Sequence, residues 1–405
     1  MVTAALDGIL VVDLSNHLSG PFATRILSDL GARIIKVEGP EGRTLPPWPD
    51  GVFPGFIPPN AGKESIALDM KSAEGLAIVH DLVRRADILV ENFRPGVTAR
   101  LGVDYETLKA LKPDLIYCSV NGFGATGPLA QKSAFDAPIQ AMSGAMSATG
   151  EADRAPALST VNIGDLAASV MAATAITAAL VERDRTGAGQ HLDIAMLDSM
   201  LYLLPIQLQM AAQAGYVMSR HGSGYGPNSI AGAFRTSDGT YLQILCPVFT
   251  FQARLRDLVA SVDGFEATTT DPRFATAGDM AANSSIFLAI ARDALETMDE
   301  ATLSRRLDEN DIPWGRINRF DEILAEPQVI HRGLIGTARV PGGGDAPLIR
   351  SPFHSASHTT GAPPKVPDYG EDNEAILEQV LGYDADRRAT LAASGAVLTA
   401  PRAPR

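Results

Sequence analysis

The chain has 405 residues, enough for two domains with substantial cores, and 45% of them are hydrophobic. This balance is typical of a globular protein that folds without disulfides. The formal net charge of −13 argues against a nucleic-acid or membrane partner, because binding to those anionic surfaces depends on a cationic face. Any anionic small molecule must therefore be held by local positive charge.

The cysteine and histidine content gives no support for a disulfide framework or a metal site. Two cysteines, Cys118 and Cys246, lie in apolar runs and are expected to be reduced core thiols. The seven histidines show no paired ligand spacing, so no metal is expected. The N-terminal stretch MVTAALDG lacks the basic and apolar regions of a secretory signal, and we expect no apolar run as long as a bilayer span. These features predict a soluble, cytoplasmic protein.

A strand–turn–helix–strand unit opens the chain. Ile9 to Val12 form an apolar strand, Gly20-Pro21 make a tight turn, and Ile34 to Val37 form a second buried strand. Gly31 stands where a left-handed helix end is expected. The helix between them has one apolar face, made by Phe22, Ala23, Ile26, Leu27 and Leu30. Such a junction can hold a large anionic ligand, although on spacing alone ordinary Rossmann-like scaffolding is the favoured interpretation.

The strand–helix alternation continues to about residue 120. The expected elements are a helix from Ser72 to Arg85, a strand from Ile88 to Val90, a short helix from Tyr105 to Leu111 and a strand from Leu115 to Val120. Continuous rather than alternating apolar strands predict a parallel sheet that is covered on both faces. The Pro- and Gly-rich stretch from Glu41 to Gly62 is expected to be a long loop.

The second half predicts two long helices and then a smaller unit. The helices are Leu166 to Arg183 and Met196 to Ala214, and a glycine-rich linker follows at Ser219 to Ser229. A strand at Tyr241 to Leu245 and three further helices then indicate an α+β unit that ends near Pro327. We therefore predict an α/β protein with a large Rossmann-like domain over residues 1–225, a small α+β domain over 226–327 and a C-terminal segment over 328–405.

Asp165 is the best candidate for a catalytic side chain. It follows Gly164 and precedes an Ala-rich helix, so one interpretation is a plain helix N-cap. The other is a nucleophile, because an aspartate at a helix N-terminus is stabilised as the anion and needs no histidine base. The sequence offers no convincing Ser-His-Asp or Cys-His set as an alternative.

Six motifs, in order, resemble the family III CoA-transferases, the CaiB/BaiF group that includes formyl-CoA and carnitine CoA-transferases. The matching segments are Ser19 to Glu38, Asn60 to Gly75, Ala86 to Gly102, Leu115 to Pro128, Gly164 to Leu180 and Arg185 to Leu201. The resemblance implies an interlocked homodimer and a C-terminal segment that returns to the large domain. It also implies that coenzyme A is a substrate, passed from an acyl-CoA to a small carboxylic acid, with no tightly bound cofactor.

In that family the residue at the Asp165 position attacks the acyl-CoA to form a mixed anhydride, which CoA then converts to an aspartyl-CoA thioester. Backbone N–H groups near Gly164 are expected to stabilise the oxyanions. The positions that match CoA contacts are Leu18, Ser19, Leu68, Lys71, Asn92, Phe93, Arg94, Arg100, Ser133, Ala134, Phe135 and Asp136. Each has a simpler alternative: the cations can be solvated surface charges, and Phe93 can be part of the core.

The chain also departs from the family pattern. Ser133 stands where a lysine is often found, Gly39 replaces a basic residue, and the linker from Gly222 to Gly226 is not an unbroken glycine run. Racemases of the same superfamily carry a His-Asp pair where this chain has Phe135-Asp136, so α-proton exchange is the less favoured alternative. A non-catalytic CoA-binding protein, in which Asp165 is only a cap, is the third.

Overall fold

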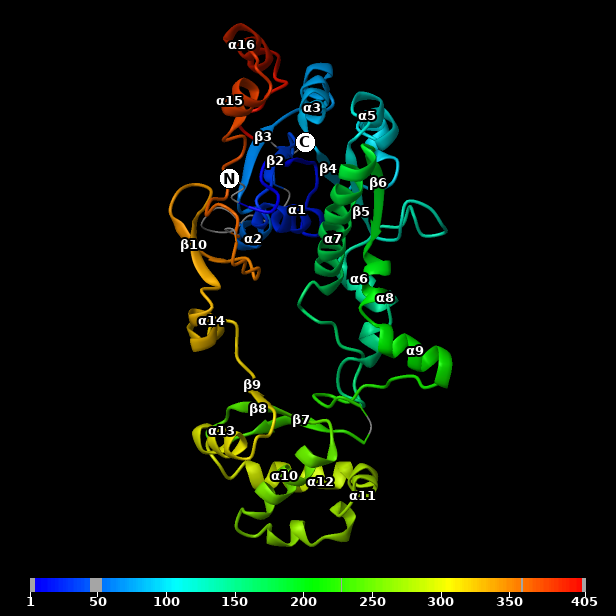
Figure 1. Ribbon diagram of the computed structural model, residues 1–405, viewed down its shortest axis with the longest axis vertical. Coiled ribbons are helices and arrows are strands. Elements are labelled where there is room, and N and C mark those ends of the chain that lie inside the picture. The colour runs from blue at the N-terminus through cyan, green and yellow to red at the C-terminus, as the bar shows by residue number, and fades with distance from the viewer. Residues whose placement is uncertain (1–3, 44–52, 227, 358–359, 403–405) are drawn as a thin grey trace. The chain divides into compact units, whose positions relative to one another are not determined.

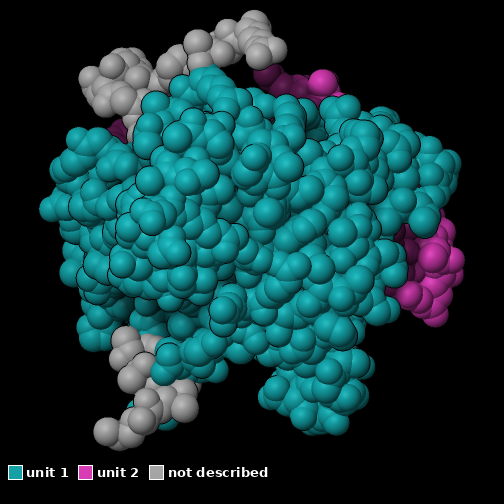
Figure 2. Space-filling view, turned by 90° about the horizontal axis from the view of Figure 1, so that it is seen from above, with its two compact units in different colours: residues 1–143, 161–204, 326–405 teal, residues 144–160, 205–325 magenta. Residues whose placement is uncertain are grey.

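The computed structural model describes residues 4–43, 53–226, 228–357 and 360–402. Its chain forms two compact units, which are coloured teal and magenta in Figure 2. The first unit contains residues 1–143, 161–204 and 326–405, and the second contains residues 144–160 and 205–325.

A six-stranded parallel sheet forms the centre of the first unit (Figure 1). Its strands stand in the order β3-β2-β1-β4-β5-β6. They are β1 (Leu10–Asp13), β2 (Arg33–Glu38), β3 (Lys63–Ala67), β4 (Ile88–Glu91), β5 (Ile116–Asn121) and β6 (Gln190–Ala195). The strand order reverses between β1 and β4, which is where ligands bind in open parallel sheets.

Both faces of this sheet are buried, as the continuous apolar strands predict. Val12 and Leu89 point into a core that includes Leu82 and Leu108 from the helices of one face. The neighbouring residues Val11, Ile34, Ile88 and Ile116 are also almost fully buried, and they point to the opposite face because successive side chains of a strand alternate. The predicted α/β fold is therefore confirmed.

The helices of the first unit include several that the sequence analysis did not anticipate. The anticipated ones are α1 (Ser19–Asp29), α3 (Ala73–Arg85), α5 (Tyr105–Leu111), α7 (Ile163–Thr186) and α8 (Met196–Tyr202). The others are α2 (Ile57–Asn60), α4 (Val97–Leu101), α6 (Asp136–Met142), α14 (Pro327–His331) and α16 (Ala385–Ser394). The sequence pattern also predicts a helix from Glu371 to Leu381, and the structure has α15 (Asn373–Ala375) and a π-helical turn, Ile376–Val380, within that range. Helix α2 lies in the stretch expected to be a loop, of which residues 44–52 fall outside the described residues.

Helix α7 corrects the expectation that no apolar run reaches the length of a bilayer span. It has 24 residues and is long and apolar enough by composition alone, yet half of its most apolar window is buried in the protein. It packs against α1, α8, β5 and β6 and lies beside the sheet in Figure 1. A central helix of a folded unit accounts for both its length and its apolar composition.

The C-terminal segment packs on the β3 edge of the sheet. The Asn373 side chain accepts from Ala67 N–H at 2.8 Å and donates to Leu398 O at 2.8 Å. Asp372 accepts from Ser65 N–H at 2.8 Å. These side chains satisfy backbone groups of an edge strand that would otherwise be open. The hairpin of β10 (Ile335–Arg339) and β11 (Asp345–Ile349) belongs to the same segment.

The second unit has a three-stranded antiparallel sheet in the order β7-β8-β9. The strands are β7 (Ile230–Arg235), β8 (Tyr241–Cys246) and β9 (Trp314–Arg316). The helices are α9 (Pro205–Ala214), α10 (Phe249–Ala260), α11 (Ala277–Ala282), α12 (Ser284–Leu295) and α13 (Glu300–Glu309). Phe234, Phe274 and Phe287 are fully buried between them and dominate its core.

The division between the units differs from the domain boundaries expected at residues 226 and 327. The single helix expected from Met196 to Ala214 is interrupted before Pro205, because proline cannot donate the helical hydrogen bond, and the division falls there. The second unit also takes in residues 144–160. The expected domain boundaries stay a prediction.

Candidate active site

A cavity of about 410 Å³ lies at the carboxyl ends of β1, β4 and β5 in the first unit. The N-terminus of α1 contributes Ser19 and the first turn of α7 contributes Asp165. The loop after β4 contributes Asn92, Phe93 and Arg94. The cavity therefore forms where the topology of the sheet places ligand sites.

The turn between β1 and α1 is held by buried polar contacts. Asp13 accepts from Ser15 N–H at 2.8 Å and also from the Ser15 hydroxyl. Gly20 is required here because a Cβ atom at this position would lie 2.3 Å from Ser15 Cβ. Ser169 of α7 donates to Ser19 O at 2.7 Å and so ties the turn to the helix that carries Asp165.

Two buried lysines fix Asp13 beneath this turn. Lys63 Nζ lies 2.8 Å from Asp13 Oδ2, and both side chains are fully buried. Lys36 donates to Ser15 O at 2.7 Å. Although burial opposes ionisation, the positive charges of Lys36 and Lys63 hold the pKa of Asp13 well below its usual range. Burial lowers the pKa of Lys63 to about 7. The turn thus rests on one buried carboxylate and two buried lysines, joined to it by side-chain and backbone hydrogen bonds.

Asp165 lies inside the first turn of α7 rather than at the N-cap, which is Asn162. The expectation that Asp165 caps this helix is therefore wrong. Burial and, to a smaller extent, the charge of Asp136 raise the pKa of Asp165 to about 6, against hydrogen bonds with Ser19 and Asn162 that lower it. Such a carboxylate is still about nine-tenths ionised at pH 7.

Asp136 takes the capping role instead. Its Oδ1 accepts from Gly164 N–H at 2.7 Å and more weakly from Asp165 N–H at 3.4 Å. Its Oδ2 accepts from the Gln140 side chain at 2.6 Å. The Gly164 amide expected to stabilise oxyanions already has a partner, so that expectation is not supported by the geometry.

The loop after β4 is anchored at two points. Asn92 accepts from Asn16 N–H at 2.7 Å and donates to Asn16 O at 2.7 Å, which joins it to the β1–α1 turn. Glu91 accepts from Phe93 N–H at 2.8 Å. Burial raises the pKa of Glu91 to about 7, against the hydrogen bonds from Ser119 and Phe93. The loop therefore presents Phe93 and Arg94 on a fixed backbone.

The structure brings together about half of the residues expected to form the site. The cavity is lined by Ser19, Asn92, Phe93, Arg94, Ala134, Phe135 and Asp165. It is not lined by Leu18, Leu68, Lys71, Arg100, Ser133 or Asp136. Leu68 is fully buried in the core, and the Lys71 side chain is 73% exposed beside Glu41.

Four polar lining residues were not among the expected CoA contacts. Lys132 precedes the serine that replaces the family lysine, and its ammonium lies 5.9 Å from the Phe123 ring centroid. His17 has a left-handed backbone, with φ of 62°, and packs edge-on against Phe135 at 6.2 Å between ring centroids. Asn16 and Asn121 complete the set. Adjacency to Ser133 in the sequence was the one signal that could have found Lys132.

The charge of the cavity suits an anionic ligand. Arg94 and Lys132 line it, and Asp165 is the single acid among the described residues that do. No carboxylate within the described ranges forms an ion pair with Arg94 or Lys132. Two free cations near one partly buried carboxylate can hold a polyanion while leaving the carboxylate to react.

Comparison with known proteins decides which family has this site. The model described as CoA-transferase family III matches residues 6–373. The chain belongs to CoA-transferase family III. The resemblance found in the six sequence motifs is therefore confirmed, and the protein is an enzyme of the acyl-CoA:carboxylate CoA-transferase class.

Members of family III in other organisms are similar over almost their full length. Acetyl-CoA:oxalate CoA-transferase of Acetobacter aceti is 36% identical, covering 88% of this chain and 92% of its own. Succinate–glutarate CoA-transferase of Agrobacterium fabrum is 33% identical, covering 93% and 95%. The crystal structure of a CaiB/BaiF family protein from Brucella suis is 35% identical, covers 93% of this chain and all of its own, and superposes with a TM-score of 0.84.

Proposed function

We propose that this family III enzyme transfers coenzyme A from an acyl-CoA to a small dicarboxylic acid, with Asp165 as the nucleophile. The observation that carries the proposal is the position of Asp165, a partly buried carboxylate that is the one acid, among the described residues, lining a cavity with two cations. Its raised pKa makes it more basic than an ordinary aspartate while leaving most of it ionised at neutral pH.

The reaction proceeds through two acyl transfers to and from Asp165. The carboxylate attacks the thioester carbonyl of RCO-SCoA, the C–S bond breaks, and a mixed anhydride and CoA thiolate result. The thiolate then attacks the aspartyl carbonyl, which releases RCOO⁻ and leaves an aspartyl-CoA thioester. The acceptor R′COO⁻ attacks the aspartyl carbonyl of this thioester, which releases CoA thiolate and forms a second mixed anhydride. The thiolate then attacks the acceptor carbonyl of that anhydride. Products are R′CO-SCoA and free Asp165.

The cations and the loop after β4 would hold the CoA moiety. Arg94 and Lys132 offer charge for phosphate, and Phe93 offers an apolar face for the pantetheine arm. Leu18, Leu68, Lys71 and Arg100 stay proposals for more remote parts of CoA, since they lie outside the cavity. Ser133 and Asp136 do not line it either, and Asp136 accepts a hydrogen bond from Gly164 N–H at the N-terminus of α7.

The substrate class follows from the relatives. Their names specify oxalate, glutarate and D-citramalate as the partners of acetyl-CoA or succinyl-CoA. Since these are small dicarboxylates, we propose an acceptor of the same kind. The homodimer and the cytoplasmic location also stay predictions. Light scattering tests the first: a stable monomer with full activity would contradict it.

The decisive experiment traps the intermediate on Asp165. The enzyme is incubated with acyl-CoA in the absence of acceptor, digested, and analysed by mass spectrometry. We expect a CoA thioester on the peptide containing Asp165 that hydroxylamine cleaves and borohydride reduces. A matrix of acyl-CoA donors and carboxylate acceptors then identifies the pair with the highest rate. Turnover without any label on that peptide would contradict the covalent mechanism.

A second candidate activity, α-proton exchange, has one observation in its favour. The cavity does contain a histidine, since His17 packs against the Phe135 that occupies the racemase histidine position. A histidine and an aspartate are the two bases such a reaction needs. Deuterium incorporation at the α-carbon of an acyl-CoA, with no transfer to any carboxylate, would favour this function over CoA transfer.

A further inference from the structure

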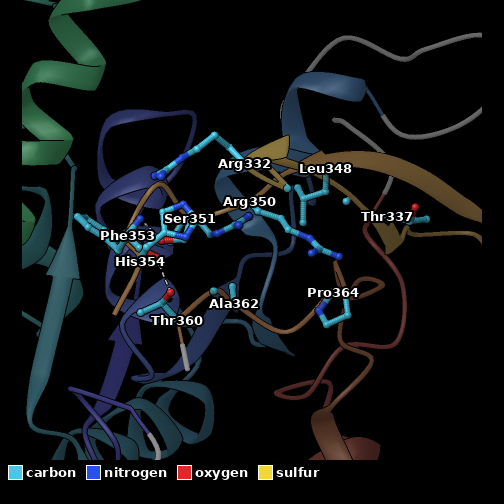
Figure 3. A pocket seen from close by; sticks show the side chains of 14 residues that line it. Arg332, Thr337, Leu348, Arg350, Ser351, Phe353, His354, Thr360, Ala362 and Pro364 are labelled. Carbon is cyan, nitrogen blue, oxygen red and sulfur yellow. Dashed lines mark hydrogen bonds between the residues drawn. The ribbon is translucent and has the colours of Figure 1, made fainter. Parts of the chain in front are cut away.

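A second cavity of the first unit, of about 370 Å³, shares no lining residue with the Asp165 cavity. Figure 3 shows the residues around it, which come from the end of α14, from β10 and β11 and from the segment that follows β11. Arg332, Arg350 and His354 are among them. No acidic residue lines it within the part of the chain that the structure describes.

The two exposed arginines of this cavity lack partners. Within the described residues, neither Arg332 nor Arg350 has a carboxylate at ion-pair distance, and neither guanidinium donates a hydrogen bond. Several other surface arginines of the unit are paired, such as Arg33 with Glu64 at 2.7 Å. Acids outnumber cations in this chain by 47 to 34, so two neighbouring arginines without an acid call for an explanation.

Arg25 also lines the cavity, and its positive charge already has an acidic partner. It is buried and makes an ion pair with Asp29 at 3.0 Å. Its remaining contacts are to Pro58 O at 3.1 Å and Ile349 O at 3.3 Å. The Asp29 carboxylate also accepts from Ala362 N–H at 2.7 Å. Asp29 Oδ1 accepts both of these bonds, and within the described residues Asp29 forms no ion pair with Arg332 or Arg350.

The backbone also favours a fixed place for Arg350. A Cβ atom on Gly336 would lie 2.3 Å from Arg350 Nε and 3.0 Å from its Cζ, so the guanidinium rests directly on the β10 backbone. Glycine is what permits this close approach. A guanidinium in this position can offer two parallel hydrogen bonds to a carboxylate or a phosphate.

We propose that this cavity binds a small anion bearing at least two negatively charged oxygen groups, held by Arg332 and Arg350 with His354 beside them. The volume is within the range of small-molecule sites. Carboxylate and phosphate present the same oxygen pairs to a guanidinium. The experiment must therefore distinguish a polycarboxylate from a pyrophosphate as the ligand. The site is independent of the CoA transfer proposed at Asp165.

Isothermal titration of the full-length protein with inorganic pyrophosphate and, separately, with citrate tests this proposal. We expect at least one to bind, and binding to weaken about tenfold or more in Arg332→Ala/Arg350→Ala. Arg185→Ala/Arg305→Ala removes the same charge from exposed arginines elsewhere and should leave binding unchanged. Gly336→Ala keeps both charges but displaces the Arg350 guanidinium, and an intermediate loss is expected. The ligand that binds more tightly identifies the source.

Several outcomes would overturn the proposal. They are no binding of either anion to the wild-type protein, equal binding in Arg332→Ala/Arg350→Ala, or an equal loss in the control double variant. A fourth is displacement of the anion by saturating CoA, which would place it in the Asp165 cavity instead. None of these results depends on whether Asp165 is the nucleophile.

Discussion

The carboxylate of Asp136 lies at the N-terminus of α7, where it accepts from Gly164 N–H at 2.7 Å and from Asp165 N–H at 3.4 Å. Two acids thus meet at one helix end. Asp136 takes the hydrogen bonds that a capping residue takes, and Asp165 keeps its carboxylate for the cavity. The charge of Asp136 also helps burial to raise the pKa of Asp165 to about 6.

The pH dependence of the reaction should report this relationship. Because the attacking form of Asp165 is the anion, kcat/KM should fall tenfold per pH unit below about pH 6. Asp136→Asn removes the like charge but keeps an oxygen that can accept from Gly164 N–H. The acidic limb of the kcat/KM profile should therefore move to lower pH. Steady-state rates across pH 4.5 to 8 measure it. An unmoved limb in Asp136→Asn would mean that another group titrates.

Replacing the nucleophile should abolish transfer without harming the fold. Asp165→Asn keeps the size of the side chain but cannot form the anhydride. Since a raised carboxyl pKa means that the charged form is disfavoured in the folded state, the melting temperature at pH 7 should be no lower than that of the wild type. Calorimetry checks stability and a CoA-ester assay checks transfer. Substantial activity in freshly purified Asp165→Asn, free of deamidation, would refute covalent catalysis.

Removal of the cavity cations should weaken acyl-CoA binding more than it slows the chemical step. Arg94→Ala and Lys132→Ala are each expected to raise KM up to about tenfold, because contacts far from the thioester bind ground and transition states alike. Lys71→Ala and Arg100→Ala should also raise KM, by less, since these residues lie outside the cavity. Arg85→Ala removes one positive charge at an exposed position of α3 and is the matched control. A larger effect at Lys71 than at Arg94 would move the phosphates away from the cavity.

The buried ion pair beneath the β1–α1 turn should be sensitive to loss of one partner. Lys63→Met leaves Asp13 charged and buried, and is expected to cost about 3–5 kcal/mol of unfolding free energy. Asp13→Asn/Lys63→Met removes both charges and should lose less unfolding free energy than Lys63→Met alone. Urea denaturation measures both variants. Equal stabilities for the single and double variants would show that the unpaired charge of Asp13 does not cause the loss of stability.

Much of the first unit could be predicted because its determinants are local in the sequence. Val11, Ile35 and Leu89 belong to uninterrupted apolar runs, and such runs form parallel strands whose two faces are both buried. Gly31 adopts the left-handed conformation expected at a helix end, with φ of 104°. The family, too, was evident from short motifs in fixed order. Periodicity and turn chemistry act over a few residues, so one sequence is enough to read them.

The tertiary structure alone decided which side chains meet. Asp136 and Gly164 are far apart in sequence yet form the cap of α7, and Lys63 of β3 reaches Asp13 of β1 past the intervening strand β2. Lys132, rather than Ser133, lines the cavity because the loop before α6 turns it inward. These contacts depend on the strand order and on the directions of the loops, which no local pattern encodes. The sequence by itself therefore determined the fold and the nucleophile candidate, and the packing determined its environment and its pKa.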